Sequence, residues 1–174
     1  MIQEAKRLGL HVFSVERIKL HGVDISSTRI REHIQAGRIE ESNTLLGYIY
    51  SCSGKVCRGQ KIGREIGFPT VNLSWTPELS PRFGVYAVRV ILEGCDKCLP
   101  GVANYGLRPT ASEGGNPLLE VHLLKDLEVQ LGTELIVKWY SFIRPEIRFP
   151  DLDALRRQIV IDKEKAFQIL SLVG

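Results

Sequence analysis

Long apolar runs are absent from this 174-residue chain, and no window approaches the roughly 18 consecutive apolar residues of a membrane-spanning helix. Residues 1–13 mix charges of both signs and lack the apolar stretch of a secretory signal peptide. Aromatic residues make up only 7% of the chain, but apolar residues reach 44%, which is enough for a core and excludes disorder. We therefore expect a cytoplasmic globular protein without a membrane partner, built as one domain plus a short attachment.

Cysteine is also scarce, and the four residues are Cys52, Cys57, Cys95 and Cys98. Their spacing does not match the paired Cys-x-x-Cys units of a zinc site. Cys52 and Cys57 are an odd number of residues apart, so a strand would place their side chains on opposite sides. The pattern predicts four reduced thiols and no structural metal.

The excess of positive charge is small, with 23 Lys and Arg against 20 Asp and Glu. A net charge of +3 is too small to indicate nucleic-acid binding by itself. The aromatic residues form no stripe with cations of the kind that stacks single-stranded bases, so we expect no nucleic-acid partner. The excess is concentrated in residues 55–67, where four cations accompany one anion.

The chain divides into three parts. In residues 1–47, the apolar run Leu10–Val15 predicts a short strand. Ser26-Ser27-Thr28 opens a helix expected to run through Ile39, and a further helical turn at 40–46 ends at Gly47. In residues 48–145, six runs rich in β-branched and aromatic residues predict an antiparallel barrel: 48–57, 70–75, 85–92, 99–104, 118–125 and 134–143.

The last part, residues 150–174, returns to a helical pattern. Asp151 is the expected N-cap. One face of the helix carries Leu152, Leu155, Ile159, Ala166 and Leu170. The sequence thus predicts a mainly β protein, a barrel with one C-terminal helix that follows a short helical piece.

Residues 54–72 form a basic, glycine-rich stretch. Glycines allow a backbone to turn its N–H groups towards an anion, and Lys61 and Arg64 add charge. The spacing is not that of a P-loop, because no hydroxyl residue follows the lysine. Two interpretations stay open, a phosphate-binding loop and an ordinary surface hairpin.

Thr70 and Asn72 lie two residues apart at a predicted strand start, so both side chains project from one face. Their neutral oxygens, beside a phosphate loop, suit Mg²⁺. The alternative is a Thr–Asn pair that hydrogen-bonds neighbouring strands.

In the run 118–124, Glu120 and His122 share one strand face with leucines. A carboxylate among apolar residues is costly unless it is paired. Glu120 is therefore either an ion-paired or edge residue, or a general base with a tuned pKa. His122 suits a hydrogen-bonding support better than a ligand.

Taken together, these motifs resemble the riboflavin kinase family over roughly residues 47–170. The residues that carry the resemblance are Gly54-x-Val56, Gly59, Gly63-Arg64, Gly67-Phe68-Pro69-Thr70-x-Asn72, Gly84-Val85-Tyr86-Ala87-Val88, Gly101-Val102-Ala103-Asn104, Gly106, Arg108-Pro109-Thr110, Glu120-Val121-His122-Leu123 and Arg144-Pro145-Glu146. The resemblance implies a six-stranded Greek-key barrel with a C-terminal helix over residues 48–174.

Residues 1–47 resemble the C-terminal end of the adenylyltransferase module of bacterial FAD synthetase. Ile25-Ser26-Ser27-Thr28-Arg29-Ile30-Arg31 is similar to a signature of that family that contacts ATP phosphates at a helix N-terminus. The chain has no His-x-Gly-His nucleotide motif, so we expect only a remnant of that module and no adenylyltransferase activity from it.

The kinase resemblance also implies a reaction, the transfer of the ATP γ-phosphoryl group to the riboflavin 5′-hydroxyl to give FMN and ADP. It implies Glu120 as catalytic base, Thr70 and Asn72 as ligands of Mg²⁺ (with Zn²⁺ as the alternative), and ATP as co-substrate. The phosphates would meet Gly59, Lys61, Gly63, Arg64 and Gly67.

The walls of the flavin site are not identified by the sequence. We expect an apolar slot between the barrel and the last helix, with Arg108 and Arg144 as candidate contacts, and a monomeric protein. The alternative function is a catalytically inactive flavin- or nucleotide-binding module.

Overall fold

The computed structural model describes residues 2–13, 15–59, 62–94, 98–107, 117–125 and 127–173, without the side chains of residues 2, 62 and 65. Six strands close into an antiparallel barrel: β3 (Ser51–Cys57), β4 (Val71–Ser74), β5 (Gly84–Leu92), β6 (Cys98–Gly106), β7 (Leu118–Leu123) and β8 (Glu134–Arg144). The order around the barrel is β3-β4-β7-β6-β5-β8. Because β8 returns to lie beside β5, which begins the consecutive run β5-β6-β7, the arrangement is a Greek key. The barrel predicted from the sequence is confirmed.

The barrel interior holds the main hydrophobic core. Alternate residues of each strand point inward, as the two-residue period of a strand requires. Trp139, Tyr86 and Tyr105 are the largest buried side chains and pack with tilted or edge-on rings. Smaller apolar side chains fill the rest: Val56, Leu73, Val88, Val90, Ala103, Leu119, Val121, Leu123, Leu135 and Val137.

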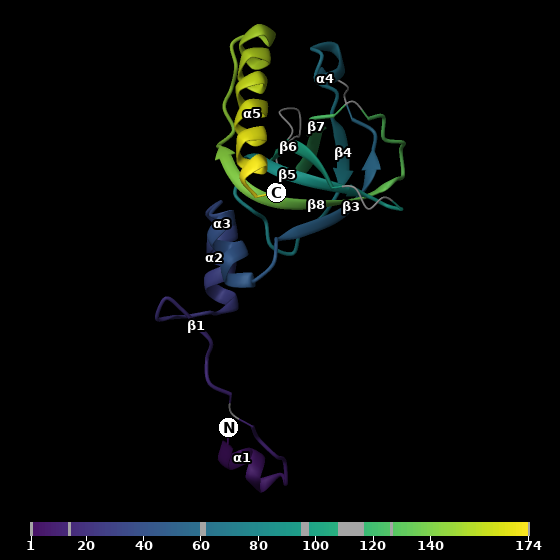
Figure 1. Cartoon of the computed structure of the whole chain (residues 1–174). Helices are drawn as coiled ribbons and strands as arrows, with labels where there is room; N and C mark the ends of the chain where they lie inside the picture. Colours follow the sequence, from purple (N-terminus) through teal and green to yellow (C-terminus); the bar gives the residue numbers. More distant parts are fainter. Residues whose placement is uncertain are drawn as a thin grey trace.

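The C-terminal helix α5 (Leu152–Leu172) covers part of the barrel's outer face (Figure 1). The side chain of Asp151 accepts a hydrogen bond from Ala154 N at 2.6 Å, which confirms the predicted N-cap. Ala166 and Leu170 pack against outward residues of β5 and β6. Leu152, which was expected on this buried face, is instead 56% exposed, because the first turn of α5 projects past the strands.

Two helices, α2 (Ser27–Gln35) and α3 (Ile39–Leu46), pack at the opposite end of the barrel from α4 (Ile62–Glu65) (Figure 1). The predicted single helix through Ile39 is wrong, because the chain turns between α2 and α3 at Gly37, which has a φ of +78°. The turn brings Ile39 into the barrel core. Asn43 Nδ2 donates to the carbonyl of Trp139 at 2.9 Å, tying α3 to β8.

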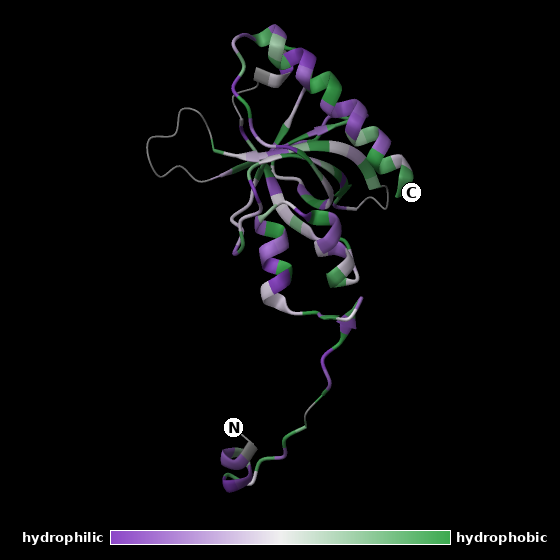
Figure 2. Ribbon diagram, turned by 90° about the vertical axis from the view of Figure 1, so that its left-hand side faces the viewer, coloured by the Kyte–Doolittle hydropathy of each residue, from purple (hydrophilic) through white to green (hydrophobic). Residues whose placement is uncertain are grey.

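The N-terminal segment runs away from the barrel and carries hydrophobic residues (Figure 2). It contains α1 (Ile2–Arg7) and a two-residue hairpin of β1 (Lys19–Leu20) and β2 (Val23–Asp24). The predicted strand at Leu10–Val15 is wrong for the residues that are described there, which have irregular backbone. A strand needs a neighbour for its backbone groups, and no described residue pairs with this run. Phe13 is accordingly 89% exposed.

The position of Ile39 generates a prediction about stability. Ile39 is fully buried in the barrel core. Ile39→Ala should lower the free energy of unfolding by about 2–5 kcal/mol, because it removes buried methyl groups and leaves a cavity. Denaturant unfolding followed by tryptophan fluorescence measures the change.

The matched control is Ile18→Ala, because Ile18 is 74% exposed. That variant should unfold within about 0.5 kcal/mol of the parent. An equally small effect of Ile39→Ala would mean that α3 is not part of the cooperative core.

Candidate functional site

A row of polar side chains crosses three neighbouring strands on the outer face of the barrel. Glu120 on β7 is directly opposite Asn72 on β4 and Asn104 on β6. Directly opposite residues in an antiparallel pair project from the same face with their Cβ atoms about 5 Å apart. The next residues along, Leu73 and Leu119, point into the core. The alternation that fills the core therefore also assembles the polar row.

Asn72 is buried, with 5% of its surface exposed, and its Oδ1 has no hydrogen-bond partner among the described residues. A buried amide oxygen without a partner is costly unless a ligand completes it. Thr70 is exposed just before β4 begins. These two residues are the predicted metal ligands, and the structure places both on the walls of the same two cavities.

His122 supports the turn that carries Thr70. Its Nδ1 lies 2.8 Å from the carbonyl oxygen of Pro69, which can only accept, so Nδ1 carries the proton. The imidazole ring also meets Phe68 edge-on, with the ring centroids 5.7 Å apart. These contacts agree with the supporting position that the sequence indicated for this histidine.

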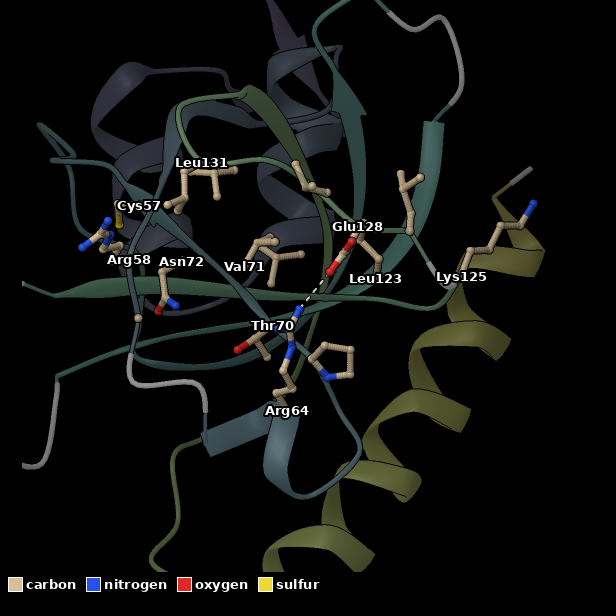
Figure 3. A pocket seen from close by; sticks show the side chains of 16 residues that line it. Cys57, Arg58, Arg64, Thr70, Val71, Asn72, Leu123, Lys125, Glu128 and Leu131 are labelled. Carbon is tan, nitrogen blue, oxygen red and sulfur yellow. Dashed lines mark hydrogen bonds and ion pairs between the residues drawn. The ribbon is translucent and has the colours of Figure 1, made fainter.

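The first cavity, of about 940 Å³, lies between β3, β4, α4 and residues 123–131 (Figure 3). Three cations line it: Arg58, Arg64 and Lys125. Arg64 Nη2 contacts Glu128 Oε1 at 3.0 Å, and both side chains are mostly exposed. An exposed ion pair contributes only about 0–1 kcal/mol to stability, so an anionic ligand can replace Glu128 as the partner of Arg64 at little cost. The cavity therefore suits a large polyanion.

Sequence reasoning missed Lys125 and Glu128 as cavity residues. Both follow β7 in sequence, and the pairing of β7 with β4 brings that segment to the basic loop. Lys61, the second cation expected in the loop, lies outside the described residues.

The glycines of the predicted phosphate loop are needed for close packing more than for unusual backbone angles. A Cβ on Gly59 would lie 1.8 Å from Asn72 Nδ2, and one on Gly63 would lie 2.4 Å from the carbonyl oxygen of Phe68. Only Gly67 of the three has a positive φ, +84°. Gly59 and Gly63 therefore let the loop press against the residues around Thr70 and Asn72, and only Gly67 uses the left-handed backbone that glycine allows.

The second cavity, of about 370 Å³, lies between the outer face of the barrel and α5. Its apolar walls come from α5, the strands and the loops beside them: Ile66, Phe68, Val85, Val102, Leu107, Leu118, Ile147, Phe149, Leu155 and Ile159. Glu120 and Asn104 provide polar groups on the strand side. Cavities of this size and polarity are typical of small-molecule sites. The apolar slot expected between barrel and helix lies here.

Arg144 and Arg108 were the candidate contacts in this slot. Arg144 lines the cavity, but its guanidinium is engaged by Asp162 of α5, with Nη2 at 2.7 Å from Oδ2 and Nε at 3.0 Å from both carboxylate oxygens. Gln158 Nε2 donates to the same carboxylate at 2.9 Å. Arg144 therefore holds α5 against β8 and shapes the cavity wall. Arg108 lies outside the described residues.

The two cavities meet at Thr70 and Asn72, which line both. On one side of this pair lies a cation-lined space, and on the other lies an apolar slot with Glu120 in its wall. This arrangement suits an anionic ligand and an apolar ligand placed end to end, with neutral oxygen donors between them. Holding two reactants in contact is the main requirement of a group-transfer reaction.

The hydroxyl-rich motif at residues 26–29 lies at the far end of the barrel, on α2 (Figure 1). Ser26 is the N-cap of that helix, and its Oγ accepts from Arg29 N at 3.2 Å. Ser27 and Thr28 are exposed, and Arg29 Nη1 is buried. None of these four residues lines either cavity.

Two further features bear on the class of site. Among the described residues, no cluster of three His, Cys, Asp or Glu side chains could hold a metal ion. None of the helices among the described residues is long and apolar enough to cross a membrane.

The Arg144–Asp162 pair generates a second stability prediction. Asp162 is only 2% exposed and the Arg144 side chain 15%, so Asp162→Asn leaves a largely buried guanidinium without its countercharge. Breaking a buried pair in this way typically costs about 3–5 kcal/mol. Denaturant unfolding measures the loss, and Asp153→Asn, on an exposed turn of the same helix, is the matched control with an expected effect below about 1 kcal/mol. Equal effects of the two variants would show that the ion pair does not fasten α5.

Comparison with known proteins finds the same family from several directions. A family model for riboflavin kinase (flavokinase) matches residues 46–170. The bifunctional riboflavin kinase/FMN adenylyltransferase of Escherichia coli (strain K12) is 41% identical over 165 residues, covering 94% of this chain and 52% of that protein. The protein of the same name from Bacillus subtilis (strain 168) is 37% identical over 160 residues, covering 90% and 50%. The chain thus spans about half the length of these curated relatives.

Solved structures also resemble the chain. The crystal structure of a macrolide-efflux protein from Streptococcus pneumoniae superposes with a TM-score of 0.81 at 30% identity, over 93% of this chain and 53% of that one. Riboflavin kinase from Trypanosoma brucei has a TM-score of 0.50 at 19% identity, over 70% and 79%, which supports the fold alone. Because the family model covers most of the sequence, the chain belongs to the riboflavin kinase family.

Proposed function

We propose that this chain transfers the γ-phosphoryl group of ATP to the 5′-hydroxyl of riboflavin, giving FMN and ADP. The observation that carries the proposal is the junction of the two cavities at Thr70 and Asn72. ATP would occupy the cation-lined cavity with its γ-phosphate at the junction, and the flavin ring would occupy the apolar slot. Family membership supplies the substrate pair, and the two cavities supply matching chemistry.

Thr70 and Asn72 would hold a divalent cation at the junction. The donor set fits Mg²⁺, because the Asn72 oxygen is buried without a partner among the described residues and the Thr70 hydroxyl is a second neutral oxygen. When bound, the ion would neutralise phosphate charge during transfer. The remaining ligands would be water and phosphate oxygens.

Glu120 would act as the catalytic base. Its position opposite Asn72 and in the wall of the acceptor slot suits a carboxylate that takes the proton of the 5′-hydroxyl. The hydroxyl oxygen then forms a bond to the γ-phosphorus while the bond from that phosphorus to the bridging oxygen breaks, and ADP leaves with the electron pair. Arg58, Arg64 and Lys125 would bind and orient the phosphates.

Residues 1–47 would be the C-terminal part of an FAD synthetase adenylyltransferase module. The 165-residue match to a bifunctional relative is longer than the kinase family match, so similarity reaches into this region. Because these 174 residues contain no His-x-Gly-His motif, we expect no FAD from FMN and ATP.

The direct test is a chromatographic assay of flavin products. Riboflavin with Mg·ATP should yield FMN, and neither riboflavin nor FMN should yield FAD. Bound flavin without FMN formation would instead favour an inactive binding module, and FAD formation would overturn the interpretation of residues 1–47.

The role of Glu120 predicts a specific kinetic defect. Glu120→Gln should lower kcat by about 10²–10⁴-fold, because the amide cannot accept the proton, while the Kd of Mg·ADP stays within a few-fold of the parent. Steady-state FMN formation and calorimetry measure the two quantities. Glu134→Gln, at the exposed start of β8, is the matched control and should keep parental turnover. Parental turnover in Glu120→Gln would remove the base assignment.

The proposed cation site predicts a loss of metal dependence. In the double variant Thr70→Ala, Asn72→Ala, adding Mg²⁺ should no longer tighten ADP binding, because both protein oxygens are gone. Calorimetric titration with and without Mg²⁺ measures the difference, and metal-free ADP should bind parent and variant alike through the cations. An unchanged Mg²⁺ effect would place the ion elsewhere.

A further inference from the structure

Cys57 lies inside the cation-lined cavity. It is the last residue of β3, and its strand neighbour Val56 points into the core, so the Cys57 thiol points outward. It pairs with Asn72 across the strands, and the thiol is partly exposed on the cavity wall. Figure 3 shows Cys57 beside Arg58, at the same end of the cavity as Asn72.

The surroundings of Cys57 mark a ligand site independently of the thiol. Asn72 lines the same cavity and is 95% buried, and its Oδ1 has no partner among the described residues. Three cations share that cavity with it. A buried amide oxygen without a partner favours a cation or a hydrogen-bond donor, and a cluster of cations favours an anion, so together they point to a ligand such as a cation-bound phosphate. Cys57 therefore lies beside the ligand that occupies the cation-lined cavity.

The other described thiols have different environments. Cys52 points into the barrel, where Trp139 Nε1 donates to its Sγ at 3.3 Å, and burial raises the pKa of its thiol to about 12. Such a thiol is inert. Cys98 begins β6, is partly exposed and lines neither cavity. Cys57 and Cys98 thus form a natural pair of accessible thiols, one inside the cavity and one outside it.

We propose that Cys57 is a modification site for low-molecular-weight disulfides and thiol-reactive electrophiles, and that modification and nucleotide binding exclude each other. The inference rests on the proposed function, because it takes the nucleotide as the occupant of the cavity. An adduct on the sulfur projects into the space beside Asn72. The bound nucleotide covers the sulfur in turn.

The reaction with a disulfide balances as a thiol–disulfide exchange. The Cys57 sulfur bonds to one sulfur of the disulfide, the old S–S bond breaks, and the released thiolate takes up the proton that Cys57 loses. The disulfide is the oxidant and is reduced to one thiol. The product is a mixed disulfide that an added thiol reverses. Oxidising conditions would thus switch nucleotide binding off reversibly.

The experiment compares labelling of the two accessible thiols in the same protein. The whole chain is treated with N-ethylmaleimide, with and without Mg·ADP, and peptide mass spectrometry follows Cys57 and Cys98 separately. At a nucleotide concentration of about 100 times Kd, few sites are open, so labelling of Cys57 should slow by more than about tenfold. Labelling of Cys98 should not change. Equal labelling of Cys57 with and without nucleotide overturns the proposal.

Calorimetry separates failure of this inference from failure of the proposed function. Protein treated with glutathione disulfide should lose Mg·ADP affinity by at least about tenfold and regain it with dithiothreitol. The affinity of Cys57→Ser protein, whatever its starting value, should not respond to the disulfide. If untreated protein binds Mg·ADP but the nucleotide does not shield Cys57, only this inference fails. If untreated protein does not bind Mg·ADP at all, the proposed function fails as well.

Discussion

The antiparallel register of β4, β7 and β6 is the constraint on which the site depends. It sets Asn72, Glu120 and Asn104 side by side on the outer face while the residues between them fill the core. A shift of one residue in this register would turn the polar row inward and the leucines outward. The hydrophobic effect that closes the barrel therefore also fixes the relative positions of the proposed metal ligand and base. Stability and site geometry have the same physical origin.

A second constraint acts through α5. Arg144 and Asp162 form a buried pair that also includes Gln158, so the charged groups lost from water regain hydrogen bonds. The pair fixes the helix at one end of the slot, and the packing of Ala166 and Leu170 fixes it along the barrel. The slot thus has one wall from the barrel and one from the helix. Its shape depends on how firmly the two are joined.

The region before the barrel is structurally mixed. Ile39 lies in the same core as Tyr86 and Trp139, so the core crosses the expected boundary at residue 47. The described residues between 8 and 18 are exposed, and Phe13 and Val15 are almost fully so. Local sequence similarity to an adenylyltransferase module and physical attachment to the kinase barrel are therefore different properties. Helices α2 and α3 are physically attached to the barrel, whatever their sequence similarity to an adenylyltransferase module.

The sequence by itself determined the six barrel strands and the C-terminal helix, and it determined which residues of a strand share a face. Alternation in residues 118–124 placed Glu120 opposite the core, and the two-residue spacing of Thr70 and Asn72 placed them together, because both facts follow from the local period of a strand. The sequence could not show that Lys125 and Cys57 line the same cavity. It also could not show that Arg144 pairs with Asp162. In both cases the two residues are separated along the chain. Nor could the sequence show that the described residues of the run Leu10–Val15 have no strand neighbour. Such relations depend on which segments the closed barrel and α5 bring together, and only the tertiary structure decides that.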